Sequence, residues 1–158
     1  MGIENDIKQQ RFRSEHEKAI INLLYTHNWV RDQIQDHFAC YDLTMQQYNI
    51  LRILRGASGQ PLSTLQIRER MLDKMSDASR LVDRLIVKKL VKKNTCKEDR
   101  RLVDVMITQT GLDLLEKLDS FSTSMDDLVN HLSAEETKQL NFLLDKIRSK
   151  PAEQLTNE

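Results

Sequence analysis

The sequence predicts a mainly helical fold with one small β-hairpin. Charged residues make up 30% of the 158-residue chain and aromatic residues only 5%, with four glycines and two prolines, a composition that favours helices. Apolar residues recur every three or four positions through most of the chain, which is the spacing of amphipathic helices. Between residues 91 and 107 this spacing gives way to partial alternation around a charged tip, which is typical of a hairpin.

The first helices follow from apolar spacing and from capping signals. A long helix is expected over residues 14–38. A second begins after Thr44, because Thr44 can cap it and Gln47 can return the hydrogen bond three residues later, as in a capping box. Ser63 and Gln66 have the same spacing and predict the start of a third helix.

The third and fourth helices are expected to be short and close together. The third is predicted to pack Leu65, Ile67 and Met71 inward, and the fourth runs from Ser76 to about Lys88. The residues expected on the inner face of the fourth helix are Ala78, Leu81, Val82 and Leu85. On its outward face basic residues recur every four positions, at Arg80, Arg84 and Lys88.

Two strands and two further helices complete the predicted order. The strands cover residues 91–93 and 102–107, with a polar tip at 94–101 between them. A long helix then carries apolar residues as far as Leu128, and a capping box at Ser133 opens the last helix. Two short helices joined by a brief turn and followed by a hairpin are the parts of a winged helix-turn-helix.

The outer helices predict a homodimer. They are long and amphipathic, and a winged core is too small to cover all their apolar faces, so a second copy of the chain is the simplest partner. We therefore expect a single domain over residues 1–158. Its parts are a winged helix-turn-helix DNA-binding lobe at 41–110, dimerisation helices at 10–40 and 111–150, and a flexible tail at 151–158.

The charge distribution predicts a double-stranded DNA partner although the net charge is zero. Residues 60–110 carry twelve basic and seven acidic side chains, a net charge of +5, whereas residues 111–158 carry five basic and ten acidic ones, a net charge of −5. Charges beyond about 10 Å are screened at ordinary salt, so DNA would sense the basic middle of the chain rather than its total charge.

The candidate DNA-binding residues lie in the fourth helix and the hairpin tip. The N-terminal half of a recognition helix reads base edges in the major groove, where serine and arginine are suitable donors. Arg84 and Lys88 lie further along and are expected to meet phosphate. At the tip, arginine can enter the minor groove, and Asp99 is expected to pair with an arginine and aim it. The candidates are Lys74, Ser76, Asp77, Ser79, Arg80, Arg84, Lys88, Lys97, Asp99, Arg100 and Arg101.

Three segments in this order resemble the MarR family, the multiple-antibiotic-resistance type of regulator. They are LTMQQYNILRIL at 43–54, SRLVDRLIVKKLV at 79–91, and EDRRLVDVMITQTG at 98–111. The last contains the family's D-x-R wing signature as Asp99-Arg100-Arg101. The resemblance covers roughly residues 15–150.

The resemblance implies a transcriptional regulator, a repressor that binds a palindromic operator as a homodimer. It implies a dimer built from the first helix and the last two, a recognition helix at about 75–88 and a wing at 91–107. In this arrangement Arg100 or Arg101 contacts the minor groove while Asp99 holds the wing. The family usually has glycine where this chain has Lys89. Glycine suits a left-handed helix cap, so strain or a shifted helix end is expected at Lys89.

The resemblance also implies a small aromatic or phenolic effector, bound between the dimerisation helices and the DNA-binding lobe. The candidate effector-binding residues are Trp29, His37, Phe38, Tyr41 and Tyr48. These aromatic side chains could equally belong to the core.

Other function classes have less support in the sequence. The chain lacks the common catalytic signatures, and its four histidines lack metal-ligand spacing, so we expect no enzyme, no metal and no cofactor. A polar N-terminus and the lack of long apolar runs predict a cytoplasmic protein without signal peptide or membrane contact. Two alternatives stay open: a winged-helix adaptor that binds protein but not DNA, and a thiol-based redox regulator that uses Cys40 or Cys96.

Overall fold

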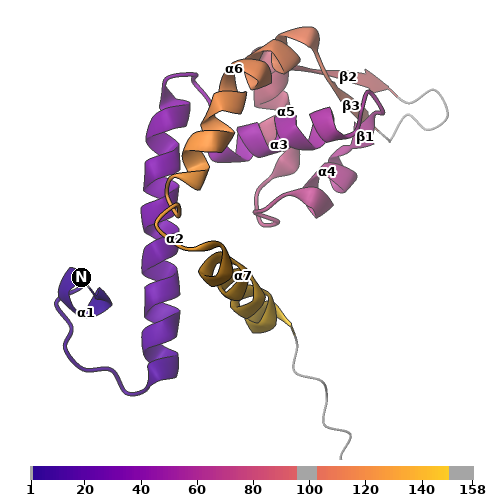
Figure 1. Ribbon diagram of the computed structural model, residues 1–158. Coiled ribbons are helices and arrows are strands. Elements are labelled where there is room, and N and C mark those ends of the chain that lie inside the picture. The colour runs from indigo at the N-terminus through magenta and orange to yellow at the C-terminus, as the bar shows by residue number, and fades with distance from the viewer. Residues whose placement is uncertain (1, 96–102, 150–158) are drawn as a thin grey trace, which may run out of the picture. The chain divides into compact units, whose positions relative to one another are not determined.

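The structure is a computed structural model that describes residues 2–95 and 103–149 (Figure 1). The chain divides into two compact units, Met1–Asp119 and Ser120–Glu158. The predicted wing tip and the predicted tail at 151–158 lie outside the described residues. Among the helices of the described part, none is both long and apolar enough to cross a membrane.

The first unit begins with two helices, α1 (Ile3–Asp6) and α2 (Glu15–Ala39). The hydroxyl of Ser14 accepts a hydrogen bond from the Glu17 amide at 3.2 Å and caps α2, which confirms the helix predicted at 14–38. The short α1 was not predicted. An ion pair between Glu4 of α1 and Lys18 of α2 joins the two helices, and it raises the pKa of Lys18 and lowers the pKa of Glu4.

Three short helices follow, α3 (Met45–Gly56), α4 (Thr64–Arg70) and α5 (Ala78–Val87). Both predicted capping boxes are present, with Thr44 and Gln47 at α3 and Ser63 and Gln66 at α4. Helix α5 starts two residues later than predicted, because Asp77 is its cap and accepts from the Arg80 amide at 3.1 Å.

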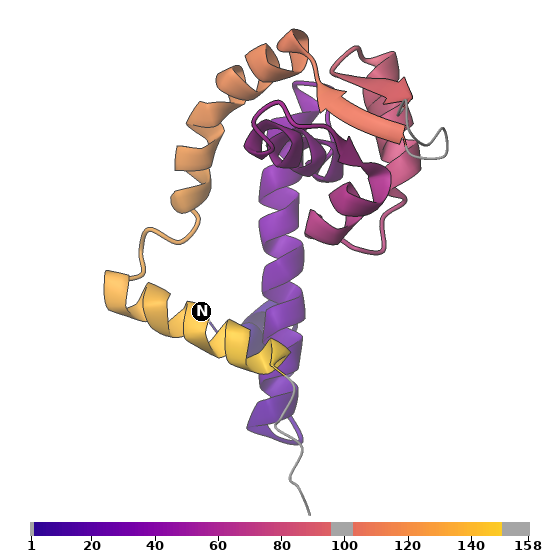
Figure 2. The ribbon, with the colours of Figure 1, turned by 90° about the vertical axis from the view of Figure 1, so that its right-hand side faces the viewer.

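The predicted hairpin is confirmed, and it belongs to a sheet of three strands. Strands β2 (Val91–Thr95) and β3 (Val103–Ile107) are antiparallel, and β1 (Leu62–Ser63) pairs with the other edge of β3, in the order β1-β3-β2. We call residues 41–110 the lobe. It contains α3, α4, α5 and this sheet, seen from two sides in Figures 1 and 2.

The core of the first unit contains apolar side chains from the lobe, from the end of α2 and from residues 115–118. Those with at most 2% of their surface exposed include Phe38, Tyr48, Ile50, Leu51, Leu54, Ile67, Val82, Leu85, Val105, Leu115 and Leu118. The inward packing predicted for Leu65 is wrong, since this side chain is 54% exposed. Helix α4 buries Ile67 and Met71, and Leu65 lies about 200° around the helix axis from Ile67.

Helix α6 (Gln109–Asp126) is fixed to the lobe at its first turn. The Thr108 hydroxyl donates to the Lys89 carbonyl at 2.7 Å and accepts from the Gly111 amide at 3.1 Å. Gly111 is needed for this close approach, because a Cβ atom there would lie 2.3 Å from the Leu90 carbonyl oxygen. The helix ends at Asp126, before Leu128, which the sequence had placed inside it.

The second unit contains α7 (Ala134–Arg148), which begins with the predicted capping box of Ser133 and Glu136. Two hydrogen bonds from Ser133 lower the pKa of the Glu136 carboxyl. Helix α7 buries none of its residues, and Phe142 and Ile147 are 63% and 66% exposed.

Candidate nucleic-acid interface

Helix α5 has one buried face and one face open to solvent. Ala78, Val82 and Leu85 are buried, and the helical period therefore turns Ser79, Arg80 and Arg84 outward. The Arg80 side chain is 83% exposed, and its guanidinium lies 3.2 Å from the Asp77 carboxylate. The N-terminal half of α5 thus presents hydroxyl and guanidinium groups that could reach base edges.

The turn that leads into α5 is held by Asp73. Its carboxylate accepts from the Ser76 hydroxyl at 2.6 Å and from the Met75 amide at 3.0 Å, and these hydrogen bonds lower the pKa of Asp73. Two predicted DNA-binding residues therefore have structural partners as well, since Ser76 secures the turn and Asp77 caps the helix.

A shallow hollow of about 430 Å³ lies between α4 and the start of α5. Its lining residues are Thr64, Leu65, Arg68, Lys74, Met75, Ser76, Asp77, Ala78 and Ser79. The hollow thus brings together the predicted residues Lys74, Ser76, Asp77 and Ser79. It also contains Arg68, Leu65 and the 95% exposed Met75, which sequence reasoning did not select.

At the other end of α5, Lys88 does not share the open face of Arg84. Its ammonium group lies 2.8 Å from the Asp42 carboxylate and also donates to the Asp42 carbonyl, in the turn between α2 and α3. Its side chain is only 25% exposed. Among the described residues Arg84 has no acidic partner, so the three basic positions that the sequence placed on one face have different surroundings.

Lys89 adopts the left-handed conformation for which glycine is usual, with φ of +61°. The Lys89 amide donates to the Ile86 carbonyl at 2.8 Å, and the Leu90 amide donates to the Leu85 carbonyl at 3.0 Å. These are the two hydrogen bonds of a Schellman motif. Lys89 therefore has the strained backbone expected of a residue with a Cβ atom in this conformation, directly after the C-cap of α5.

The wing is described only at its base. Lys92 is exposed on β2, and Lys93 pairs with Asp83 of α5. The predicted minor-groove residues Lys97, Asp99, Arg100 and Arg101, and also Cys96, lie outside the described residues, so their roles stay predictions. Cys40 is the exposed C-cap residue of α2.

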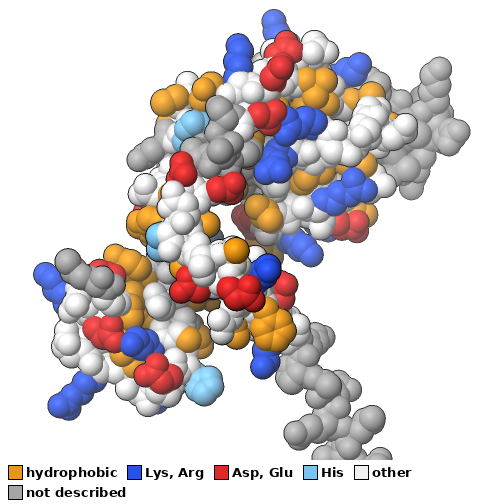
Figure 3. Space-filling view, viewed as in Figure 1, with side chains coloured by type: hydrophobic (Ala, Val, Ile, Leu, Met, Phe, Trp, Pro, Cys, Tyr) orange, Lys and Arg blue, Asp and Glu red, His pale blue; other side chains and the backbone are white. Residues whose placement is uncertain are grey.

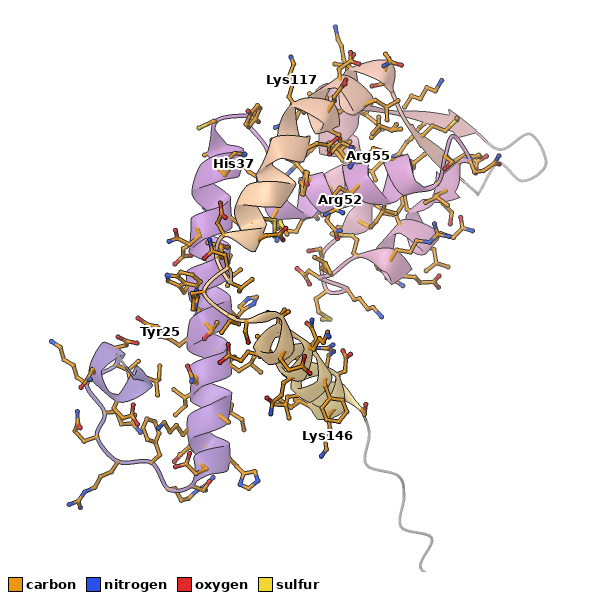
Figure 4. All side chains as sticks on the ribbon, viewed as in Figure 1. Tyr25, His37, Arg52, Arg55, Lys117 and Lys146 are labelled. Atoms are coloured by element: carbon orange, nitrogen blue, oxygen red, sulfur yellow. The ribbon has the colours of Figure 1, made fainter. Side chains whose placement is uncertain are left out.

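Basic side chains also gather over α3, where they have partners inside the protein. Figure 3 shows several Lys and Arg side chains on the viewer's face of the lobe, and Figure 4 labels Arg52 and Arg55 on α3. Arg55 makes two hydrogen bonds with the Asp119 carboxylate, at 2.8 and 2.9 Å, and Arg52 lies 5.8 Å from the centre of the Tyr48 ring. Arg52 and Arg55 thus have intramolecular contacts, whereas Arg84 of α5 has no acidic partner among the described residues.

Four of the five candidate effector-binding residues form a ring cluster at the end of α2. Phe38 and Tyr48 are buried with ring centres 4.6 Å apart, and His37 lies 5.9 Å from both Phe38 and Tyr41. Trp29 lies further back on α2 and is 43% exposed. A second hollow of about 530 Å³ is lined by Ala39, Asp42, Leu43, Thr44, Gln47, Arg84, Val87 and Lys88, a set without any of the five. Phe38 and Tyr48 belong to the core, and an effector role for the five stays a prediction.

Comparison with known proteins places this arrangement in one family. The model of the MarR family matches residues 41–102, which include α3 to β2. The structure of a MarR transcription factor from Planctomyces limnophilus is 34% identical with a TM-score of 0.67, and the match covers 85% of this chain and 98% of that one.

Two further relatives agree with this match. The HTH-type transcriptional regulator MhqR of Bacillus subtilis (strain 168) is 25% identical over 131 residues, covering 82% of this chain and 89% of MhqR. A mutant MarR from E. coli, solved with operator DNA, has a TM-score of 0.71 at 21% identity, over 93% of this chain and 99% of that one. These relatives share the winged-helix fold predicted from the sequence.

Proposed function

The chain belongs to the MarR family of winged helix-turn-helix transcriptional regulators, and we propose that it represses transcription by binding a palindromic operator as a homodimer. Membership of a transcription-factor family agrees with the prediction that the chain is not an enzyme. The observation that carries the proposal is the open face of α5, where Ser79, Arg80 and Arg84 project from a helix whose other face is buried.

Within the proposed interface the residues have separate roles. Lys74 in the turn before α5, and Ser79 and Arg80 in its first turn, contact base edges in the major groove. Arg84, further along, contacts phosphate. Lys88 instead braces α5 against the turn after α2, through its pair with Asp42. In the wing, Arg100 or Arg101 enters the minor groove and Asp99 holds it, as the family resemblance implies.

The proposed dimer covers the apolar faces that the outer helices expose. Ile20 and Leu24 of α2 are 61% and 59% exposed, and Phe142 and Ile147 of α7 are 63% and 66% exposed. Burying a large apolar side chain is favourable by about 1.5–3 kcal/mol, so these residues favour association. A dimer would also present two copies of α5 to successive major grooves, about 34–36 Å apart.

We further propose that a small aromatic or phenolic effector releases the DNA. Such a ligand would act by preferring a dimer in which the two copies of α5 have another spacing, and its effect is limited by its differential affinity for the two states. An anionic phenol could meet Arg84 in the second hollow, where the neighbouring Lys88 is already paired with Asp42.

The proposal is tested by the salt dependence of DNA binding. Duplexes bound by the full chain are selected from genomic fragments, and affinity is measured by fluorescence anisotropy over a range of salt concentrations. Arg84→Ala should weaken binding and reduce the slope of log affinity against log salt by about one. Arg55→Ala is the matched control, because it removes the same charge from a residue paired with Asp119, and it should leave the slope unchanged.

Two results would contradict the proposal. Equal slopes for Arg84→Ala and the wild-type chain would show that Arg84 does not contact phosphate. Failure to select any duplex at low salt, with a protein partner recovered instead, would favour an adaptor that has lost DNA binding.

A further inference from the structure

Two large apolar side chains stand exposed beside the residues proposed to read bases. Met75 is 95% exposed and Leu65 is 54% exposed, and both line the hollow between α4 and the start of α5. They come from different elements, since Leu65 lies in α4 and Met75 in the turn that leads into α5. The hollow therefore offers apolar contact in addition to charge.

The backbone that carries Met75 is fixed on both sides. The amide of Met75 donates to the Asp73 carboxylate at 3.0 Å, and the amide of Leu72 donates to the Asn49 side chain of α3 at 3.0 Å. Met71 before the turn and Ala78 after it are both buried. Met75 is therefore exposed on a turn whose backbone is held in place by the lobe.

The surroundings of the two side chains favour DNA as the occupant of the hollow. Lys74 and Arg68 supply positive charge at its border, the Asp77 carboxylate in the hollow is paired with Arg80, and Ser79 joins the hollow to the open face of α5. In the major groove, thymine is the base that carries a methyl group, at C5, and apolar side chains recognise it by contact. The hollow thus combines attraction for phosphate with an apolar surface of the kind that a methyl group contacts.

We propose that Met75 and Leu65 are specificity-determining residues that select thymine in the operator by contact with its C5-methyl group. The inference rests on the proposed function, because it requires α5 to lie in the major groove. Burial of one methyl group changes affinity about fourfold, so each contacted thymine should be preferred by roughly that factor over the same base without its methyl group.

The test replaces thymine by deoxyuridine, which differs only by the methyl group. A duplex is first selected from a random library with the full wild-type chain, and each thymine is then replaced singly. Anisotropy titrations should show at least one position in each half-site where deoxyuridine weakens wild-type binding about fourfold. The Met75→Ala or Leu65→Ala chain should bind the thymine and deoxyuridine duplexes equally at that position.

The controls separate methyl recognition from a general loss of binding. Met75→Leu keeps an apolar side chain and should keep the deoxyuridine effect. Val87→Ala truncates an 82% exposed side chain at the other end of α5, outside this hollow, and should also keep it. Because Met75 and Leu65 are exposed, their alanine variants should melt close to the wild-type temperature.

The outcomes distinguish this inference from the proposed function. A selected duplex in which no deoxyuridine weakens wild-type binding would overturn thymine recognition and leave DNA binding intact. A deoxyuridine effect of the same size in the wild-type, Met75→Ala and Leu65→Ala chains would overturn the assignment to these residues. If the wild-type chain selects no duplex, the proposed function fails, and the inference with it.

Discussion

The lobe and α7 are both amphipathic in sequence, but they differ in burial. The apolar side chains of the lobe form a buried core, whereas those of α7 are exposed. Ile50, Val82 and Val105 come from three elements far apart in the chain, and none has any exposed surface. Helix α7 buries no residue, although it carries four large apolar side chains that are 41% to 66% exposed. The lobe thus buries its own core, whereas the apolar side chains of α7 are exposed and would be covered in the proposed dimer.

The largest expected effect comes from truncating the core of the lobe. Leu85→Ala removes a fully buried side chain from α5 and should lower the free energy of unfolding by about 2–5 kcal/mol. The measurement is urea denaturation at a fixed protomer concentration. Val87→Ala, on the same helix but 82% exposed, should change stability by less than about 0.5 kcal/mol. Similar losses for both variants would show that α5 is not packed as described.

A second effect is expected where α6 meets the lobe. Gly111→Ala places a Cβ atom 2.3 Å from the Leu90 carbonyl oxygen, and the shift it forces should destabilise the chain by about 1–3 kcal/mol. Gly56→Ala, at the last residue of α3, is the matched control, because a Cβ atom there would meet no other part of the protein within 4 Å. It should be neutral or stabilise by up to about 1 kcal/mol. Thermal unfolding of the two variants compares them, and an unchanged midpoint for Gly111→Ala would contradict the close contact.

A third and smaller effect concerns the end of α5. Lys89→Gly should be more stable than Lys89→Ala by about 1 kcal/mol, because φ of +61° strains every residue that has a Cβ atom. Both variants lose the same charge, so their difference in urea denaturation isolates the backbone. Equal stability would mean that residue 89 leaves the left-handed region when lysine is replaced.

The smallest effect lies at the start of α7. Hydrogen bonds from Ser133 lower the pKa of Glu136, so this carboxylate stabilises the helix start above its ordinary pKa, and that contribution is lost as pH falls through the lowered value. Titration of the Glu136 carboxyl by NMR should show the lowered pKa. Ser133→Ala removes the hydroxyl but keeps the amide of residue 133, which donates to the carboxyl at 2.8 Å, so it should return the pKa only part of the way toward the ordinary value. An ordinary pKa for this carboxyl in the wild-type chain would contradict the capping box.

The parts of the fold that follow from short-range signals could be predicted from the sequence. The capping boxes at Thr44, Ser63 and Ser133 each depend on residues three positions apart, and all three are present. Strand β1 has only two residues and is defined by its pairing with β3, for which no local pattern exists. Leu65 was misplaced because α4 is too short for its apolar spacing to fix which face is buried.

In the candidate site, too, contacts between residues far apart in the chain could not be predicted. The basic spacing of Arg80, Arg84 and Lys88 predicted one outward face, but Lys88 turns to Asp42, 46 positions earlier in the chain. The exposed Met75 could not be found from its residue type, because methionine is ordinarily a core residue. The sequence thus predicted which helix carries the candidate interface. It could not predict which side chains of that helix are paired with other parts of the lobe.

The division of roles between the lobe and the outer helices is tested most directly by the mass of the protein–DNA complex. Native mass spectrometry of the full chain with a selected palindromic duplex should give two protomers per duplex, because in the proposed dimer α2 and α7 join the copies and each lobe contacts one half-site. One protomer per duplex, bound as tightly to an isolated half-site as to the palindrome, would contradict this division.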